Sequence, residues 1–175
     1  ATAQVPPERI TPRTIAPPQE SLEKAVKLIK PSKRPVIVAG HGARFHMEAV
    51  TSLAEQLNAP VLTTFKGKGL IPDHHPLAAG VLGRSGTPVA SWFMNESDLL
   101  IVLGASFSNH TGITPKKPTI QVDFDPLALS KFHPIDAPVW GELSVTVNQL
   151  LEACGPGILT VDKRPELAAR WQIWN

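Results

Sequence analysis

The stretch VIVAGHGARF, residues 36–45, places a run of small and branched apolar residues directly before Gly40-His41-Gly42. A short uninterrupted apolar run is typical of a strand that is buried on both faces of a parallel sheet. Small residues directly after such a strand are typical of a turn that lets backbone N–H groups approach a phosphate. A compact turn without a ligand explains Gly40 and Gly42 equally well, so this turn alone is weak evidence for a bound nucleotide.

The stretch departs from the dinucleotide-binding fingerprint in two places. The third glycine of the fingerprint would fall at position 45, where the chain has Phe45. The acidic residue that holds the ribose hydroxyls should follow about 20 residues later, but the second predicted strand ends in Thr63-Thr64. We therefore do not expect the ordinary NAD site of a free-standing dehydrogenase.

Strand and helix patterns alternate along the rest of the chain. Apolar residues spaced i, i+3, i+4 and i+7 predict helices over residues 21–29, 46–57, 90–95 and 143–153. Continuous apolar runs predict strands over residues 35–39, 61–64, 99–103, 119–124 and 138–140. This alternation predicts an α/β fold in which helices cover both faces of a parallel sheet and ligands bind beyond the strand ends.

The two flanks have a different composition. Residues 1–20 are rich in proline and poor in large apolar side chains, which predicts an extended interdomain linker. Residues 155–175 begin with Gly155-Pro156-Gly157 and carry Trp171 and Trp174, so we expect a tail that buries its indoles on a surface outside this unit and leads toward a missing C-terminal domain. The folded unit is expected to cover residues 21–154, as a piece of a longer protein.

Composition excludes several classes of protein. The net charge is +2 and the charges are scattered, so no nucleic-acid partner is expected. The one cysteine excludes a disulfide framework and favours a reducing, cytoplasmic setting. The longest apolar run, residues 99–105, is far shorter than the ~18 residues that a membrane span needs.

The remaining turns also lack large side chains. Glycines flank Lys68 in the second turn, and Gly83 and Gly86 punctuate the third. The fourth turn, GASFS, is one residue short of the GxSxG elbow of hydrolases, because Ser108 stands in place of the last glycine. We therefore expect it to accommodate a flat or extended ligand rather than to supply a nucleophile.

Two carboxylates, Asp123 and Asp125, follow the fifth predicted strand. Such a pair can perform acid–base catalysis, hold a metal ion, or accept hydrogen bonds from ribose hydroxyls. Pro126 follows directly and no histidine or third acid is near, so ribose binding or helix capping is favoured. No catalytic residue and no metal ligand is predicted in this chain.

Five ordered segments, RPVIVAGHGA, LAEQLNAPVLTTFKGKGLIPDHHPLAAGVLGRSGT, SDLLIVLGASF, PTIQVDFDP and VWGEL, together resemble the central domain of thiamine-diphosphate-dependent enzymes. The resemblance covers about residues 21–154 and is greatest to acetolactate synthase and pyruvate oxidase. It implies a three-layer Rossmann-like fold of the DHS-like NAD/FAD-binding type, with a six-stranded parallel sheet. In that family the domain lies between a pyrimidine-binding and a diphosphate-binding domain.

The resemblance further implies an ADP-containing cofactor, which is FAD in the acetolactate synthase and pyruvate oxidase branches and ADP in the oxalyl-CoA decarboxylase branch. Carried onto this chain, it implies a set of contacts that runs from the phosphates and the flavin side to the adenine: Gly40, His41 and Gly42 at the ribose and phosphates, Thr63, Thr64 and Phe65 along the flavin, Gly83, Arg84 and Ser85 at the ribityl chain, Gly104, Ala105 and Ser106 behind the pyrophosphate, Asp123 and Phe124 at the adenosine, and Glu142 with Leu143 over the adenine.

The chain departs from that family in the fourth turn. Flavin-bearing members carry arginines there, as in GARFDDR, whereas this chain has GASFSNH with Ser106 and His110 in those places. A charge-assisted hydrogen bond is roughly twice as strong as a neutral one, so these replacements weaken the expected anion contact.

The family's GDG motif, which holds thiamine diphosphate and Mg²⁺, is absent from this chain. We therefore expect a non-catalytic fragment whose parent is a transferase or lyase of 2-keto acids, with the two missing domains and further copies in a dimer or tetramer as its partners. The fragment would scaffold the oligomer and bind FAD or ADP. The alternative is a purely structural interdomain module, without nucleotide, from a pyruvate oxidase-like or decarboxylase-like parent.

Overall fold

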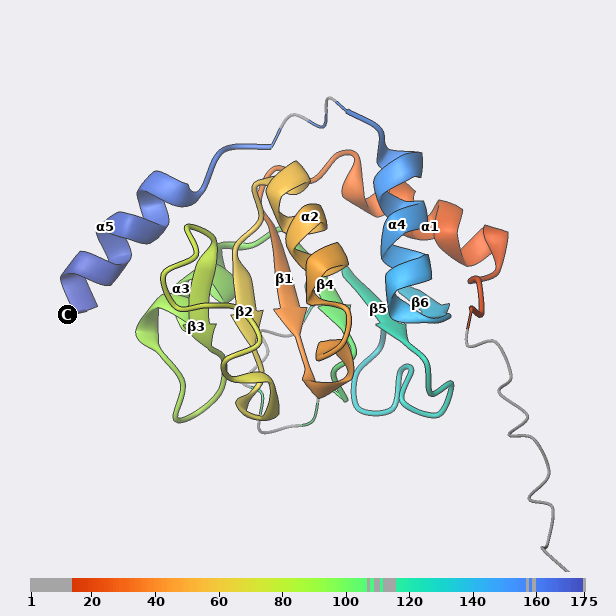
Figure 1. The fold of residues 1–175 in the computed structure, drawn as a ribbon, viewed down its shortest axis with the longest axis horizontal. Coiled ribbons are helices and arrows are strands. Elements are labelled where there is room, and N and C mark those ends of the chain that lie inside the picture. The colour runs from red at the N-terminus through yellow and green to blue at the C-terminus, as the bar shows by residue number, and fades with distance from the viewer. Residues whose placement is uncertain are drawn as a thin grey trace, which may run out of the picture.

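The computed structural model describes residues 14–106, 108, 111, 116–156, 158 and 160–174. Its centre is one six-stranded sheet in the order β3-β2-β1-β4-β5-β6, in which every pair of neighbours is parallel (Figure 1). The strands are β1 (Pro35–Ala39), β2 (Val61–Thr63), β3 (Ala78–Val81), β4 (Leu99–Leu103), β5 (Thr119–Asp123) and β6 (Ala137–Trp140). The predicted α/β class with a parallel sheet is confirmed.

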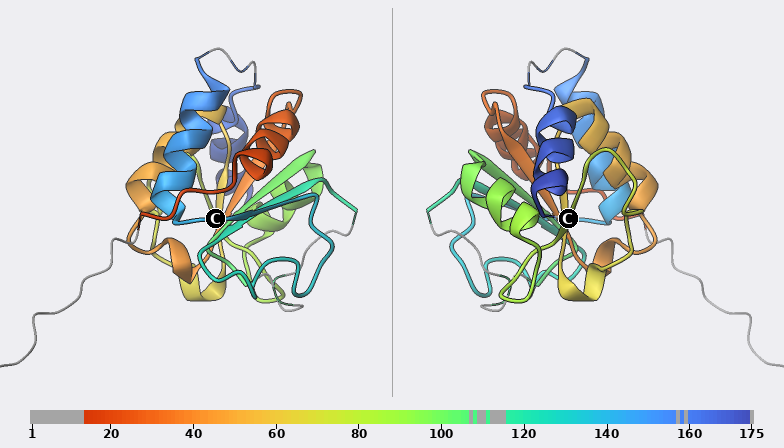
Figure 2. Two further views of the ribbon diagram at one scale, coloured as in Figure 1. Left: turned by 90° about the vertical axis from the view of Figure 1, so that its right-hand side faces the viewer. Right: turned by 90° about the vertical axis from the view of Figure 1, so that its left-hand side faces the viewer.

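Helices cover both faces of this sheet (Figure 2). Helices α2 and α4 lie on one face with α1 packed beside α4, and α3 lies on the opposite face. Their bounds are α1 (Gln19–Ile29), α2 (Met47–Leu57), α3 (Pro88–Glu96) and α4 (Leu143–Cys154), and two single-turn 3₁₀ helices, η1 (His41–Ala43) and η2 (Phe65–Gly67), follow β1 and β2. Among the described residues, no helix is both long enough and apolar enough to cross a bilayer.

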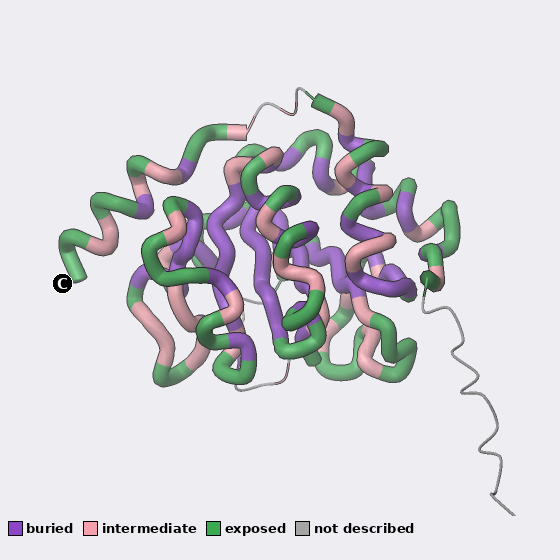
Figure 3. The backbone as a smooth tube through the Cα atoms, viewed as in Figure 1, coloured by how far each residue is buried: buried purple, intermediate pink, exposed green. Residues whose placement is uncertain are grey.

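The strands follow their sequence pattern because the sheet is covered on both sides. Every residue of β1 and of β4 is buried, which is why these two strands are continuous apolar runs (Figure 3). The edge strand β3 carries Ala78, Ala79 and Gly80, residues of low strand propensity, and no strand is predicted there from the sequence. Pairing with β2 supplies the stabilisation that local propensity does not.

The turns after β1 and β4 are in direct contact, because the chain leaves β1 toward β2 and leaves β4 toward β5. The N–H of Gly40 donates to Leu103 O at 2.9 Å, and the N–H of Gly42 donates to Gly104 O at 2.9 Å. A Cβ atom added to Gly40 would clash with Gly104 O and lie 2.5 Å from the Cα of Ala105. This is the topological switch point, where open parallel sheets bind their ligands.

Residues 164–174 form a fifth helix, α5 (Arg164–Trp174), which packs beside α3 at the β3 edge (Figure 2). Arg34 donates to both carboxylate oxygens of Glu166, at 2.9 and 3.1 Å, and Trp92 Nε1 donates to the same carboxylate at 2.9 Å. Leu167 is buried against the domain. The expectation that the indoles of the tail need a surface outside this unit is wrong for Trp171, whose Nε1 donates to Ala78 O at 2.9 Å, whereas Trp174 remains 49% exposed.

We predict that Gly40→Ala lowers the free energy of unfolding by about 3 kcal/mol, because the added methyl group meets backbone atoms that cannot rotate away. The φ angle of Gly40 is −100°, which alanine tolerates, so the loss would come from crowding alone. Gly69→Ala is the control: its φ is +84° and no atom lies within 4 Å of the added Cβ, so only the left-handed strain of about 1 kcal/mol remains. Urea unfolding measures the free energy of unfolding of both variants. Equal losses would contradict the close contact of Gly40 with the fourth turn.

Glu166→Ala should release α5, because the carboxylate joins Arg34 and Trp92 to this helix. The side chains of the ion pair are 32% and 29% exposed, so solvent screens part of the attraction and the expected loss of stability is about 1–2 kcal/mol. Hydrogen exchange of the α5 amides should accelerate. Glu152→Ala, which removes an exposed carboxylate of α4, should leave that exchange unchanged; slow α5 exchange in both variants would refute the role of Glu166.

Candidate functional site

Two adjoining cavities lie over the carboxyl ends of β1, β4, β5 and β6, with volumes of about 580 and 610 Å³. They share Gly42, Arg44, Gly104 and Asp123, so they form one continuous cleft, which we call the switch-point cleft. A third cavity of about 700 Å³ lies beside β2 and β3 and shares Phe65 with the cleft. The three cavities together follow one edge of the sheet from β6 to β3.

Most of the residues that the resemblance implied line these cavities. The switch-point cleft contains His41, Gly42, Thr64, Phe65, Gly104, Ala105, Ser106, Asp123, Phe124, Glu142 and Leu143. Thr63 and Ser85 line the third cavity. Gly40, Gly83 and Arg84 are not among the lining residues of the three, and His110 lies outside the described residues.

The backbone of the first turn is occupied by the fold itself. Besides Gly40 and Gly42, which bond to the fourth turn, Ala43 N–H donates to Gly40 O at 3.0 Å and Arg44 N–H to His41 O at 3.2 Å. Helix α2 begins only at Met47. The two glycines therefore serve turn-on-turn packing, and positive charge in the cleft must come from side chains.

Arg44 is the cleft residue that sequence reasoning missed. It lines both cavities of the cleft, its Nη1 donates to His41 O at 3.1 Å, and its guanidinium lies 4.5 Å from the centre of the Phe45 ring. Lys66 lines the first cavity as well, and among the described residues neither cation takes part in an ion pair. The sequence does show a basic residue two positions after Gly42. The resemblance, however, predicts the positive charge in the fourth turn, where this chain has the exposed Ser106.

Carboxylates provide the acceptors of the cleft. Asp123 Oδ1 accepts the N–H of Asp125 at 2.9 Å, and Asp125 Oδ1 accepts the N–H of Leu127 at 2.9 Å, so each also stabilises the loop after β5. Burial raises the pKa of Asp123 above its ordinary value of 3.8, and the negative charge of Asp125 adds to this rise. A hydroxyl donor or a cation bound nearby would relieve both effects.

Glu142 forms the far wall of the cleft and begins helix α4. Burial raises its pKa, but the hydrogen bonds that its carboxylate accepts from Val145 N–H and Ser144 outweigh burial, so the pKa lies below its ordinary value. His46 Nδ1 lies 3.1 Å from Glu142 Oε1. This carboxylate is therefore committed to capping the helix and to His46.

The cleft combines three kinds of chemical group. It offers carboxylate acceptors at Asp123 and Asp125, cations at Arg44 and Lys66, and exposed aromatic rings at Phe45 and Phe124. Within the part of the chain that the structure describes, no group of three His, Cys, Asp or Glu side chains could hold a metal ion.

Comparison with known proteins gives a consistent picture. Residues 22–150 match the model of the family described as "Thiamine pyrophosphate enzyme, central domain". The chain is 38% identical over 148 residues to a "Probable acetolactate synthase large subunit" of Methanococcus aeolicus, covering 81% of this chain and 24% of that protein. It is 35% identical over 144 residues to the "Acetolactate synthase large subunit" of Corynebacterium glutamicum, covering 78% of this chain and 23% of that protein.

A solved structure shares the fold. A protein from Mycobacterium smegmatis, assigned to the thiamin diphosphate-dependent enzymes, superposes with a TM-score of 0.69 at 25% identity, over 85% of this chain and 30% of its own. The chain thus spans about a quarter of the length of the curated relatives named above.

Asp123→Asn should raise the melting temperature at neutral pH. The pKa of Asp123 is raised in the folded state, so its contribution to stability is complete below 3.8 and is lost as pH rises through the raised pKa. The neutral amide removes that loss, and the advantage of the variant should disappear as pH falls toward 3.8. Thermal unfolding from pH 3 to 8 tests this, with exposed Asp73→Asn as the control; a difference that is independent of pH would contradict the assignment.

Proposed function

Because the chain belongs to the family of thiamine pyrophosphate enzymes, of which it is the central domain, we propose that its switch-point cleft binds the ADP moiety of a nucleotide cofactor. One observation carries the proposal: Arg44 and Lys66 share a cavity with Asp123 and Asp125 over the carboxyl ends of the strands. The cations can bind a diphosphate, and the carboxylates can accept hydrogen bonds from ribose hydroxyls. A ligand that contains both groups, a nucleoside diphosphate, therefore fits the cavity better than a diphosphate or a ribose alone.

The proposed pose follows the distribution of these groups. The diphosphate lies next to Arg44, whose guanidinium is held by His41 O and by the Phe45 ring. The ribose hydroxyls donate to Asp123, whose raised pKa such donors would lower. The adenine lies in the cavity that Phe124 and Leu143 line, where an exposed aromatic face is available for stacking.

The parent protein is proposed to be a thiamine-diphosphate- and Mg²⁺-dependent enzyme of the acetolactate synthase type that decarboxylates a 2-keto acid and transfers the aldehyde unit. This chain would supply no catalytic group to that reaction. It would carry FAD or ADP and join the pyrimidine-binding and diphosphate-binding domains within a homo-oligomer. Its lone buried thiol, Cys154, supports the cytoplasm as the proposed location.

Calorimetric titration of the chain with ADP and with FAD tests the nucleotide role. Both should bind, and Arg44→Ala should weaken ADP about tenfold, the loss expected for one charge-assisted contact. Lys24→Ala removes an equal charge from exposed α1 and should leave ADP affinity unchanged.

Failure of both nucleotides to bind would remove the nucleotide role and favour the second candidate, a structural interdomain module. If Arg44→Ala and Lys24→Ala weaken ADP equally, Arg44 is rejected as the phosphate ligand. The loss of affinity would then be explained by the change in net charge alone.

A further inference from the structure

Helix α5 is docked on the domain mainly through polar groups and rings. Among the residues of this helix, only Leu167 is buried. The carboxylate of Glu166 accepts from Arg34 and Trp92, and the guanidinium of Arg170 lies 3.4 Å from the centre of the Trp92 ring. One buried apolar side chain stabilises a docked helix by only a few kcal/mol. The docking therefore depends on the charged and aromatic contacts.

Lys163, directly before α5, is a buried cation in this contact. The residue is only 2% exposed, and its Nζ lies 3.9 Å from Glu166 Oε2. Charge-assisted N–H···O bonds are about 2.7–2.9 Å long, so this ion pair compensates only weakly for the water that the ammonium has lost. Lysine is almost never fully buried unless it is well paired. The docked arrangement therefore holds a positive charge that is poorly compensated.

The groups around Lys163 determine how its charge affects docking. Burial lowers the pKa of Lys163 below its ordinary value of 10.5, and the positive charge of Arg34 lowers it further. Three carboxylates oppose this shift: Glu166, Asp98 and Asp162. Because the pKa is lowered in the docked form, the charged ammonium opposes docking, and this effect is relieved only as pH rises through the lowered pKa toward 10.5. At neutral pH Lys163 thus weakens the docking that Glu166 supports.

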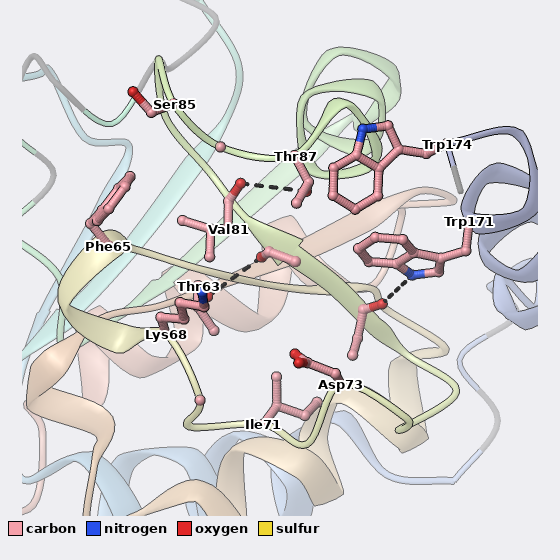
Figure 4. A pocket seen from close by; sticks show the side chains of 14 residues that line it. Thr63, Phe65, Lys68, Ile71, Asp73, Val81, Ser85, Thr87, Trp171 and Trp174 are labelled. Carbon is pink, nitrogen blue, oxygen red and sulfur yellow. Dashed lines mark hydrogen bonds between the residues drawn. The ribbon is translucent and has the colours of Figure 1, made fainter.

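The same helix forms one wall of the third cavity, beside β2 and β3. Trp171 and Trp174 lie together on one side of this cavity, and a dashed line marks the hydrogen bond from the Trp171 indole to Ala78 O (Figure 4). A Cβ atom on Gly80 would lie 3.1 Å from the Trp171 ring, so the indole is in close contact with β3. Release of α5 would therefore remove this wall and uncover the edge strand.

We propose that α5 is a strap with a docked and a released form, that Lys163 keeps the docked form marginally stable, and that release opens the third cavity. The strap thereby controls access to the cavity from the β3 edge. This inference is independent of the proposed function, because it concerns a helix of this chain and requires no bound nucleotide.

Hydrogen exchange of the indole N–H groups, followed by NMR on the 175-residue chain at neutral pH, tests the strap. Trp92 donates to Glu166 and Trp171 donates to Ala78 O, so both indoles report docking. Trp140 donates to Phe124 O at 3.0 Å at the β6 edge and is the internal reference. If α5 opens as one unit, Trp92 and Trp171 should exchange at similar rates, and both faster than the backbone amides of β4, which exchange only on global unfolding.

Lys163→Met replaces the ammonium with an apolar side chain of similar length. Replacing a poorly compensated buried charge in this way commonly stabilises a contact, so exchange of Trp92 and Trp171 should slow at least about fivefold while Trp140 is unchanged. Glu166→Ala should accelerate exchange of Trp171. Lys24→Met, which removes an exposed charge from α1, is the matched control and should alter none of the three indoles.

Three results would overturn the proposal. Faster exchange of Trp171 in Lys163→Met would show that Lys163 supports docking. Exchange of both indoles at the rate of the β4 amides would show that α5 opens only with the whole domain. Exchange of Trp92 with continued protection of Trp171 would show that only the start of the helix frays and that the cavity stays closed.

Discussion

The contact between two glycine turns is the constraint on which the rest of this molecule depends. Gly40 and Gly42 lie against Gly104 and Ala105 with no room for a side chain, and two backbone hydrogen bonds of 2.9 Å join the turns. The contact joins the ends of β1 and β4 at the point where strands are added toward opposite edges of the sheet. Both turns also line the switch-point cleft, through Gly42 and Gly104.

The same contact decides how the cleft obtains its charge. The N–H groups of Gly40 and Gly42 donate within the fold, so they are not available to an anion. Arg44 emerges from the same turn and lines both cavities, which places a cation in the cleft opposite the turn that carries Ser106.

Helix α5 connects the stability of the domain with the shape of its cavities. Glu166 joins it to Arg34, which directly precedes β1, and to Trp92 of α3. The same docking brings Trp171 and Trp174 to the edge strand β3, where small residues leave space. A segment that was expected to be a tail leading away from the domain is therefore part of the wall of a cavity.

The sequence by itself determined the alternation of strands and helices, the burial of β1 and β4, the four small-residue turns and the acids after β5, because these depend on local periodicity and on residue type. Only the tertiary structure decided that residues 78–81 form a strand, since Ala78 and Gly80 have little strand propensity and need β2 as a partner. It alone decided that Arg44 lines the cleft and that α5 returns to the domain. Both arrangements rest on contacts between residues far apart in the chain, such as Arg34 with Glu166, whose free energy no local pattern carries.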